Sequence, residues 1–357
     1  MKTRSAIESL NTYVPGERRA NTIKLASNEN PHGCSPTVAD AVAAAARELH
    51  IYPDGAARDL VNGIAALYNV DPEWIITGNG SDEILTLIAG TYVDPGDEVL
   101  IAEHTFSEYE FATRVYGGRI TSVPMPNLEI HPQDYLAYLT DNVTVVFLCS
   151  PNNPTGGAFS QRELETFLEE VPASVLVVVD HAYIEYQNDP AAAHADSLVA
   201  RYPNLVVLHT FSKVYGLAAV RLGYGLAQPE RIAEIKRVRP PFSVNGVAQA
   251  AGIAALSDQD FVTRSLERNL RGVVRMQTLC DELGLHHLPT EANFITVRVP
   301  LDAREAAEYI ARRGITVRAL NSFNLPDYLR ITIGTSTQLD QLESILRALV
   351  VDYPPGP

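Results

Sequence analysis

Cysteine is scarce in this chain of 357 residues, which contains only Cys34, Cys149 and Cys280. Three is an odd number, and the three are too far apart for a CxxC metal or redox motif. A disulfide framework is therefore excluded as the basis of the fold, and we expect a reducing compartment. A chain of this length can bury a sizeable core without such links.

Positive charge and long apolar runs are also in short supply. Lysine and arginine number 28 against 43 acidic residues, which gives a formal net charge of −15. A chain this acidic is a poor general ligand for nucleic acid or an anionic membrane, so we expect neither as a partner. The longest apolar run, 41–46, is too short to cross a bilayer, and no apolar stretch follows residues 1–4 as in a signal peptide. These absences predict a cytoplasmic protein that binds phosphate only in a dedicated pocket, if at all.

What the sequence does contain is a series of short apolar runs separated by helical stretches. The runs lie at 75–77, 99–101, 145–149, 175–179, 206–208 and 222–226. Their apolar residues are consecutive, which is typical of strands buried on both faces of a parallel sheet. Helices are predicted between them at 81–92, 160–170 and 229–238. We therefore expect an α/β fold, with a large doubly wound, mostly parallel-sheet domain over residues 27–255.

The C-terminal part of the chain follows a different order. Helices predicted at 260–283, 303–313 and 339–350 are interleaved with strand candidates at 294–297, 315–318 and 328–333. This order indicates a smaller α+β domain. We expect residues 1–26 to pack with 256–357 to form it.

Four polar clusters follow predicted strands, at the edge of an open α/β sheet where ligands bind. The first two are Gly78–Glu83 and Ser150–Gly156. In the first, glycines and Ser81 favour a tight turn into a helix whose free N–H groups suit a phosphate, although an ordinary capped turn has the same pattern. In the second, two prolines around two asparagines favour a rigid loop with amide side chains at a strand end.

The other two clusters centre on Asp180 and Lys213. Asp180 ends the most apolar strand, where an unpaired carboxylate is costly, so it needs a protonated ring nitrogen or a salt bridge as partner. Lys213 follows another strand, with Arg221 eight residues on. A lysine is usually solvated, but desolvation beside a cation makes it a nucleophile that forms Schiff bases. Together, a phosphate cradle, an anion for a pyridinium and such a lysine meet the needs of pyridoxal 5′-phosphate.

These motifs, in this order and spacing, resemble the fold-type-I, pyridoxal-phosphate-dependent class I/II aminotransferases, and among them the histidinol-phosphate aminotransferase family. The resemblance spans nearly the whole chain. It rests on Asn-Pro-Thr-Gly at 153–156, Asp-x-Ala-Tyr at 180–183, Ser-Lys-x-x-Gly-Leu-Ala-x-x-Arg-x-Gly at 212–223, and the segments 13–16, 24–31, 52–55, 80–83, 239–249 and 329–335. It implies a large sheet domain with a smaller α+β domain.

The resemblance also implies a role for each matching residue. Lys213 is expected to form the Schiff base, and Asp180 to pair with the pyridine nitrogen. Asn153 and Tyr183 are expected to bond the ring hydroxyl, and Tyr183 is counted with Lys213 and Asp180 as catalytic. The implied phosphate site comprises Gly80, Ser81, Asp82, Thr210, Ser212 and Arg221, with Phe106 stacked on the ring.

For the substrates, the resemblance implies amino transfer from L-histidinol phosphate to 2-oxoglutarate. Histidinol phosphate carries a phosphate ester where glutamate has its α-carboxylate, so one site has to accept both anions. The guanidinium fork of Arg330 suits either, with Arg318 and Tyr13 as further contacts, although Arg318 could equally be a solvated strand end. The resemblance also implies a homodimer, in which Tyr52 reaches the cofactor phosphate of the other subunit.

One residue departs from the pattern of the family, which usually carries glutamate where this chain has His181. Strand alternation predicts that this side chain points away from the side of Asp180, so the chemistry should survive. Two interpretations stay open: a tolerated replacement behind the site, or an altered substrate preference through a titratable imidazole.

Three other functions also stay open. A broad aromatic amino-acid aminotransferase would use the same residues, although Arg318 argues against it. An amino-acid-phosphate decarboxylase shares the fold and cofactor, and the segment 105–109 resembles that branch. A non-catalytic binding module is disfavoured, because a complete set of residues for the cofactor is present.

Overall fold

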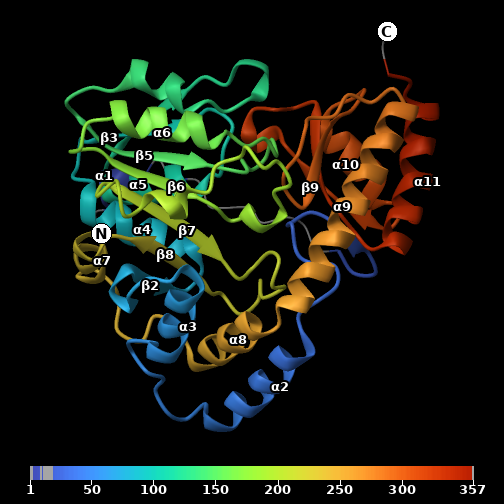
Figure 1. Ribbon diagram of the computed structural model, residues 1–357. Helices are drawn as coiled ribbons and strands as arrows, with labels where there is room; N and C mark the ends of the chain where they lie inside the picture. The colour runs from blue at the N-terminus through green and yellow to red at the C-terminus, as the bar shows by residue number, and fades with distance from the viewer. Residues whose placement is uncertain (1–2, 9, 11–18, 356–357) are drawn as a thin grey trace.

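The computed structural model describes residues 3–8, 10 and 19–355, and a seven-stranded sheet lies at its centre (Figure 1). The strands are β2 (Ile75–Gly78), β3 (Glu98–Ala102), β4 (Arg119–Val123), β5 (Val143–Cys149), β6 (Leu176–Asp180), β7 (Leu205–Thr210) and β8 (Gly223–Ala227). Their order is β2-β8-β7-β6-β5-β3-β4. Strand β8 is antiparallel to both its neighbours, and the pairs among β3 to β7 are parallel. The mostly parallel sheet expected from the sequence is therefore confirmed.

One strand, β4, was not predicted, and another, β8, runs antiparallel, each for a physical reason. Strand β4 is absent from the predicted set because it is a partly exposed edge strand with polar residues and no continuous apolar run. The run at 222–226 forms β8, which is antiparallel to β7 within a sheet that was expected to be mostly parallel. The connection from β7 to β8 contains no helix, and parallel neighbours need a crossover connection.

Helices cover both faces of the sheet, which makes the large domain a three-layer α/β structure. One face carries α4 (Ser81–Tyr92), α5 (Glu108–Tyr116) and α7 (Pro229–Lys236). The other carries α3 (Arg58–Tyr68), α6 (Gln161–Glu170) and α8 (Gly246–Ser257), and α2 (Pro36–Ala45) packs on α8. The three helices predicted here are confirmed, and α6 begins with a capping box between Ser160 and Glu163.

The C-terminal domain is built on a three-stranded antiparallel sheet in the order β11 (Arg318–Ala319), β12 (Tyr328–Thr332), β9 (Phe294–Arg298). Helices α10 (Ala303–Ala311) and α11 (Ser336–Asp352) pack on it. The strand expected at 315–318 is split, because β10 (Ile315–Thr316) pairs with β1 (Ile23–Lys24) while β11 pairs with β12. Residues 23–25 thus pack with this domain, whereas α1 (Ser5–Glu8) lies against α5 of the large domain.

A single long helix, α9 (Gln259–Glu282), connects the two domains. Near its start, Val262 is buried in the core of the large domain, and further on Val273 and Met276 are buried in the core of the small one. Figure 1 shows this helix running from α8 toward α11. The domain boundary predicted after residue 255 therefore lies four residues before the start of α9, the helix whose side chains contribute to both cores.

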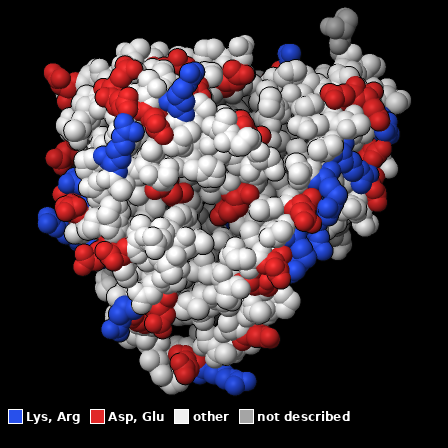
Figure 2. Space-filling view, in the orientation of Figure 1, with Lys and Arg blue, Asp and Glu red and all other residues white. Residues whose placement is uncertain are grey.

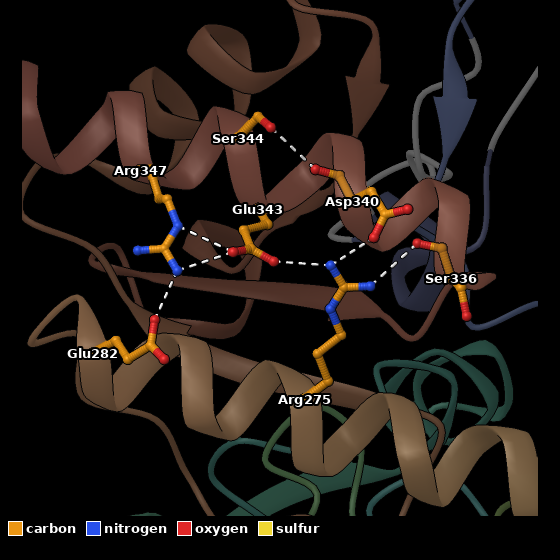
Figure 3. Close-up of polar contacts among 7 residues, drawn as sticks. All are labelled: Arg275, Glu282, Ser336, Asp340, Glu343, Ser344 and Arg347. Atoms are coloured by element: carbon orange, nitrogen blue, oxygen red, sulfur yellow. Dashed lines mark hydrogen bonds and ion pairs between the residues drawn. The ribbon is translucent and has the colours of Figure 1, made fainter.

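Polar contacts also join α9 to α11 on the outside of the small domain (Figure 3). Arg275 lies 2.7 Å from Asp340 and 2.8 Å from Glu343, and Arg347 lies 2.7 Å from Glu282 and 2.9 Å from Glu343. Exposed pairs of this kind contribute about 0–1 kcal/mol each, so the buried apolar side chains hold this domain together.

Figure 2 shows acidic and basic side chains interspersed on one face of the molecule. Of the helices within residues 3–8 and 19–355, none is both long and apolar enough to span a membrane.

Candidate active site

A pocket lies at the carboxyl edge of the parallel strands, between the two domains, and gathers most of the predicted residues. Twelve of them line it: Ser81, Asp82, Phe106, Asn153, Asp180, Tyr183, Thr210, Ser212, Lys213, Arg221, Arg318 and Arg330. The first ten come from the large domain, and Arg318 and Arg330 come from β11 and β12 of the small one. The expectation that the strand ends converge on one site is therefore correct for these residues.

Asp180 is the buried anion of this pocket, with a residue exposure of 2%. Its Oδ2 atom accepts a hydrogen bond from the Tyr109 hydroxyl at 2.7 Å, and its Oδ1 atom accepts one from the Ala182 N–H at 3.0 Å. Burial raises the pKa of Asp180, and the two hydrogen bonds oppose this by stabilising the anion. Because both donors are neutral, the carboxylate keeps its charge available for a cationic partner in the pocket.

Lys213 supplies a candidate nucleophile opposite this anion. Its Nζ atom lies 5.5 Å from the ring centroid of Tyr183 and 3.4 Å from the carbonyl oxygen of Ser27. Burial, and then the positive charge of Arg330, lower the pKa of Lys213 to about 8. Roughly one tenth of the amine is therefore unprotonated at pH 7, far more than for an ordinary lysine, and this is the form that Schiff-base formation requires.

The start of α4 and the β7–β8 connection form the candidate phosphate cradle. Arg221 donates from Nη2 to Asp82 at 2.9 Å and from Nη1 to the Ser212 hydroxyl at 3.4 Å. Gly80 precedes α4 with φ +82°, and a Cβ atom there would lie 2.5 Å from Nη2 of Arg221. Only glycine therefore lets the guanidinium approach the first N–H groups of the helix, where an anion is favoured.

Arg330 and Asn153 join the two domains inside the pocket. Arg330 is 7% exposed, and its Nη1 group donates to the Asn153 side-chain oxygen while Nη2 donates to the Ala26 carbonyl at 3.0 Å. Arg318 is the register partner of Arg330 across β11 and β12, so the two side chains lie on the same face of the sheet. The pair places two guanidinium groups at the small-domain wall of the pocket.

Three side chains that shape the site were not predicted as site residues. Tyr109 holds Asp180, and Asn28 donates to the Tyr183 hydroxyl at 2.9 Å. Asn152, fully buried, bonds the His104 carbonyl and the Thr105 hydroxyl, at 2.9 and 2.8 Å, and so braces the loop that carries Asn153. All three lie within segments already singled out, 24–31, 105–109 and 150–156, but each of these partners is more than 40 residues away, so no local pattern predicts the contact.

Other predicted residues lie elsewhere. Tyr52 does not line the pocket; it is 80% exposed and its ring stacks on Phe242 at 4.7 Å. Tyr13 lies outside the described residues. His181 is fully buried and faces away from the pocket, as strand alternation predicted. The imidazole therefore has no contact with the pocket interior, which favours the first of the two interpretations given for it.

The residues present fit pyridoxal phosphate. Asp180 offers a buried carboxylate to a protonated ring nitrogen, and Lys213 offers an amine of lowered pKa to the aldehyde. The guanidinium of Arg221 and the first N–H groups of α4, at Ser81 and Asp82, suit the phosphate. Cys149 also lines the pocket, but burial raises the pKa of its thiol, so it is protonated at neutral pH and an unreactive neighbour.

Comparison with known proteins agrees with this geometry. The family described as "Aminotransferase class I and II" matches residues 20–349. Two curated proteins named histidinol-phosphate aminotransferase, from Moorella thermoacetica and Symbiobacterium thermophilum, are 44% and 40% identical to this chain. The matches cover 98% and 97% of this chain, and 92% and 98% of those proteins.

A solved structure shares the architecture as well. The histidinol-phosphate aminotransferase from Sinorhizobium meliloti, determined in complex with pyridoxal 5′-phosphate, superposes with a TM-score of 0.90 at 27% identity. The match covers 98% of each chain. The protein therefore belongs to the class I and II aminotransferase family and is a pyridoxal-phosphate-dependent aminotransferase.

Proposed function

We propose that this aminotransferase transfers the amino group of L-histidinol phosphate to 2-oxoglutarate, yielding imidazole acetol phosphate and L-glutamate. The observation that carries the proposal is the pair of arginines, Arg318 and Arg330, at paired positions of β11 and β12 in the pocket wall. Two guanidinium groups suit a phosphate ester on one substrate and a carboxylate on the other. The names of the relatives from Moorella and Symbiobacterium support the same substrate.

The residues of the large domain would bind and orient the cofactor. Asp180 would pair with the ring nitrogen, while the Asn153 amide and the Tyr183 hydroxyl would bond the ring hydroxyl. The phosphate would lie at the start of α4, on Ser81, Asp82 and Arg221, with Thr210 and Ser212 beside it, and Phe106 would cover one ring face. When bound, pyridoxal phosphate supplies an electron-withdrawing ring that stabilises negative charge on the amine-bearing carbon.

Lys213 would carry the proton transfers. With the cofactor and substrate bound, the Nζ atom of Lys213 would remove the proton from the amine-bearing carbon of the substrate and hold it for the return transfer. The lowered pKa of Lys213, about 8, favours the unprotonated base that this step needs. Arg330, through its bonds to Asn153 and to the Ala26 carbonyl, would hold the substrate anion at a fixed place relative to this base.

We also propose that the active unit is a homodimer in which Tyr52 contacts the cofactor phosphate of the other subunit. Leu49, Ile51 and Tyr52 are 72%, 60% and 80% exposed, a stretch of surface that a second copy could cover. Mixing the Tyr52→Ala and Lys213→Ala variants tests the arrangement. If Tyr52 acts across the interface, mixed dimers contain one intact site, and activity rises above the sum of the two variants. If it acts within its own chain, no intact site forms and the activity stays at that sum.

The substrate is tested in a single half-reaction. The protein loaded with pyridoxal phosphate is mixed with L-histidinol phosphate, without a keto acid, and the visible spectrum of the cofactor is followed. We expect stoichiometric conversion to the amine form of the cofactor. An unchanged spectrum, with conversion by phenylalanine or tyrosine instead, would assign the protein to the aromatic branch, and release of carbon dioxide from an amino-acid phosphate would indicate a decarboxylase.

The role of Lys213 has a convenient internal control. The sequence contains only four lysines, Lys2, Lys24, Lys213 and Lys236. Lys213→Ala should abolish turnover while the protein still binds the cofactor noncovalently, and Lys236→Ala on the exposed surface of α7 should leave both unchanged. Reduction of the loaded protein with borohydride should fix the cofactor to the peptide that contains Lys213; fixation to another lysine would refute the assignment.

A further inference from the structure

His181 is a fully buried imidazole whose two nitrogen atoms both have backbone partners. Its Nδ1 atom lies 2.7 Å from the carbonyl oxygen of Ser150, and its Nε2 atom lies 3.1 Å from the backbone nitrogen of Ala195. The ring lies behind the strand end that carries Asp180 and does not reach the pocket. It therefore connects three segments of the large domain from behind the site.

These two partners fix the protonation of the ring. A carbonyl oxygen can only accept a hydrogen bond, and a backbone N–H can only donate one. Nδ1 must therefore carry the hydrogen, and Nε2 must be bare, which makes the ring neutral. Burial lowers the pKa of His181 to about 4, which agrees with a neutral ring at physiological pH. A carboxylate at this position has no hydrogen to donate to the Ser150 carbonyl when it is ionised.

Ser150 is the first residue of the loop that carries Asn153. Its N–H donates to the carbonyl oxygen of Asp180 at 3.1 Å, and its own carbonyl accepts from His181. The start of the loop is thus bonded on both sides to the chain that carries Asp180. Three residues further on, Asn153 lines the pocket and accepts the hydrogen bond of Arg330.

We propose that neutral His181 is a positioning residue that fixes the Ser150–Asn153 loop relative to Asp180, and so sets how Asn153 meets the cofactor ring. This inference rests on the roles proposed above for Asn153 and Asp180. The second bond, to the Ala195 N–H, holds the imidazole in the orientation that the first bond needs. His181 acts through Asn153 and touches neither substrate nor cofactor.

Two substitutions separate this role from simple packing. In His181→Asn the amide reaches the Nδ1 position, so it can donate to Ser150 but leaves the Ala195 N–H without its acceptor. In His181→Gln the amide reaches the Nε2 position, so it can accept from Ala195 but leaves the Ser150 carbonyl without its donor. Each variant loses the ring and one buried hydrogen bond, so both should lower the melting temperature of the protein by similar amounts.

The measurements are the dissociation constant of pyridoxal phosphate and the pH midpoint of the visible absorption change of the loaded protein. We expect His181→Gln to weaken cofactor binding about tenfold or more and to shift the midpoint, because the donor to the ring hydroxyl is displaced. His181→Asn should stay close to the parent in both. Equal changes in the two variants, no change in either, or a change in His181→Asn alone would overturn the proposal.

Coupling to Asn153 provides a second test. In an Asn153→Ala background, His181→Gln should add little further loss of cofactor affinity, whereas an independent structural effect would add in full. If His181→Gln does not fold, ¹⁵N NMR of the histidine-labelled parent protein decides the matter. A signal for Nδ1–H between about pH 6 and pH 8 is expected, and an Nε2–H tautomer or a charged ring would overturn the proposal. None of these measurements uses histidinol phosphate, so they can fail or succeed independently of the proposed substrate.

Discussion

Tyr109→Phe should make cofactor binding sensitive to acid. The Tyr109 hydroxyl donates to Asp180 at 2.7 Å, and both residues are buried, at 0% and 2% exposure. Burial already raises the pKa of Asp180, and the tyrosine hydrogen bond works in the opposite direction. Removing the hydroxyl therefore favours the protonated carboxyl group, which cannot form an ion pair with a protonated ring nitrogen.

The size of the effect follows from the bond that is lost. A buried hydrogen bond to a charged group contributes about 1.5–3 kcal/mol, which corresponds to roughly 10- to 150-fold in the ratio of ionised to protonated Asp180. The dissociation constant of pyridoxal phosphate should rise by up to this factor at low pH, where protonation of Asp180 competes with binding. The increase should become smaller as the pH rises, because ionisation of Asp180 becomes more complete in both proteins.

The assay is a titration of the cofactor-free protein with pyridoxal phosphate between about pH 6 and about pH 8.5. The phenylalanine ring keeps the stacking of Tyr109 on Phe147, whose ring centroid is 4.9 Å away, so packing is conserved. Tyr135→Phe is the matched control, because Tyr135 is equally buried but its hydroxyl lies 3.5 Å from a backbone carbonyl and does not touch Asp180. An affinity ratio that is the same at every pH, or that Tyr135→Phe reproduces, would refute the reasoning.

Three further predictions concern the substrate anion and stability. Arg330→Lys keeps the charge but loses the fork, so kcat/KM should fall by about 10- to 150-fold for both histidinol phosphate and glutamate, and a loss confined to one would exclude a shared anion site. Burial raises the pKa of Glu185 to about 7, so the folded chain retains a proton that the unfolded chain releases above about pH 4.5, and stability falls as the pH rises through this window. Glu185→Gln should therefore increase the unfolding free energy at pH 8 by up to about 3 kcal/mol, with a higher melting temperature. At about pH 4.5 the substitution should not stabilise the protein. Gly272→Ala places a Cβ atom 2.3 Å from the Ile333 side chain and should lower the unfolding free energy measured in urea by about 1–3 kcal/mol. Gly63→Ala is the control, because its Cβ atom would lie 3.3 Å from the flexible end of Leu256. It should be neutral or stabilise the protein by up to about 1 kcal/mol.

The sequence predicted the large domain well because its strands are buried on both faces. Consecutive apolar residues at 145–149 and 175–179 mark strands, and the carboxyl ends of parallel strands share one edge, so the clusters around Asn153 and Asp180 had to meet. Helices α2, α3, α5 and α8 were not among the predicted elements. Helix α8, for example, is rich in small residues and has no pronounced apolar face, so its sequence carries no clear helical period.

The contacts that tune the site could not be predicted in the same way. Tyr109 is 71 residues from Asp180 in sequence, and Asn28 is 155 residues from Tyr183. Each hydrogen bond depends on how α5 and the segment after β1 pack around the sheet, and neither residue stands in a periodic pattern that would mark it. His181 was recognised as unusual from its type alone, but its two backbone partners follow from the fold.

In the roles proposed above, Arg330 would connect the recognition of the substrate anion to the placement of the cofactor. Its guanidinium group comes from the small domain and donates to Asn153 and to the Ala26 carbonyl, so it already spans the pocket before any anion is present. An anion bound by the same group would contact a guanidinium whose orientation is set by its hydrogen bond to Asn153, the residue proposed to bond the ring hydroxyl. The two ends of that loop are then held by different means, since His181 fixes Ser150 from behind the sheet and Arg330 fixes Asn153 from the pocket. In these roles, the substrate anion, the loop and the cofactor ring would share one set of contacts, which is consistent with the burial of Arg330.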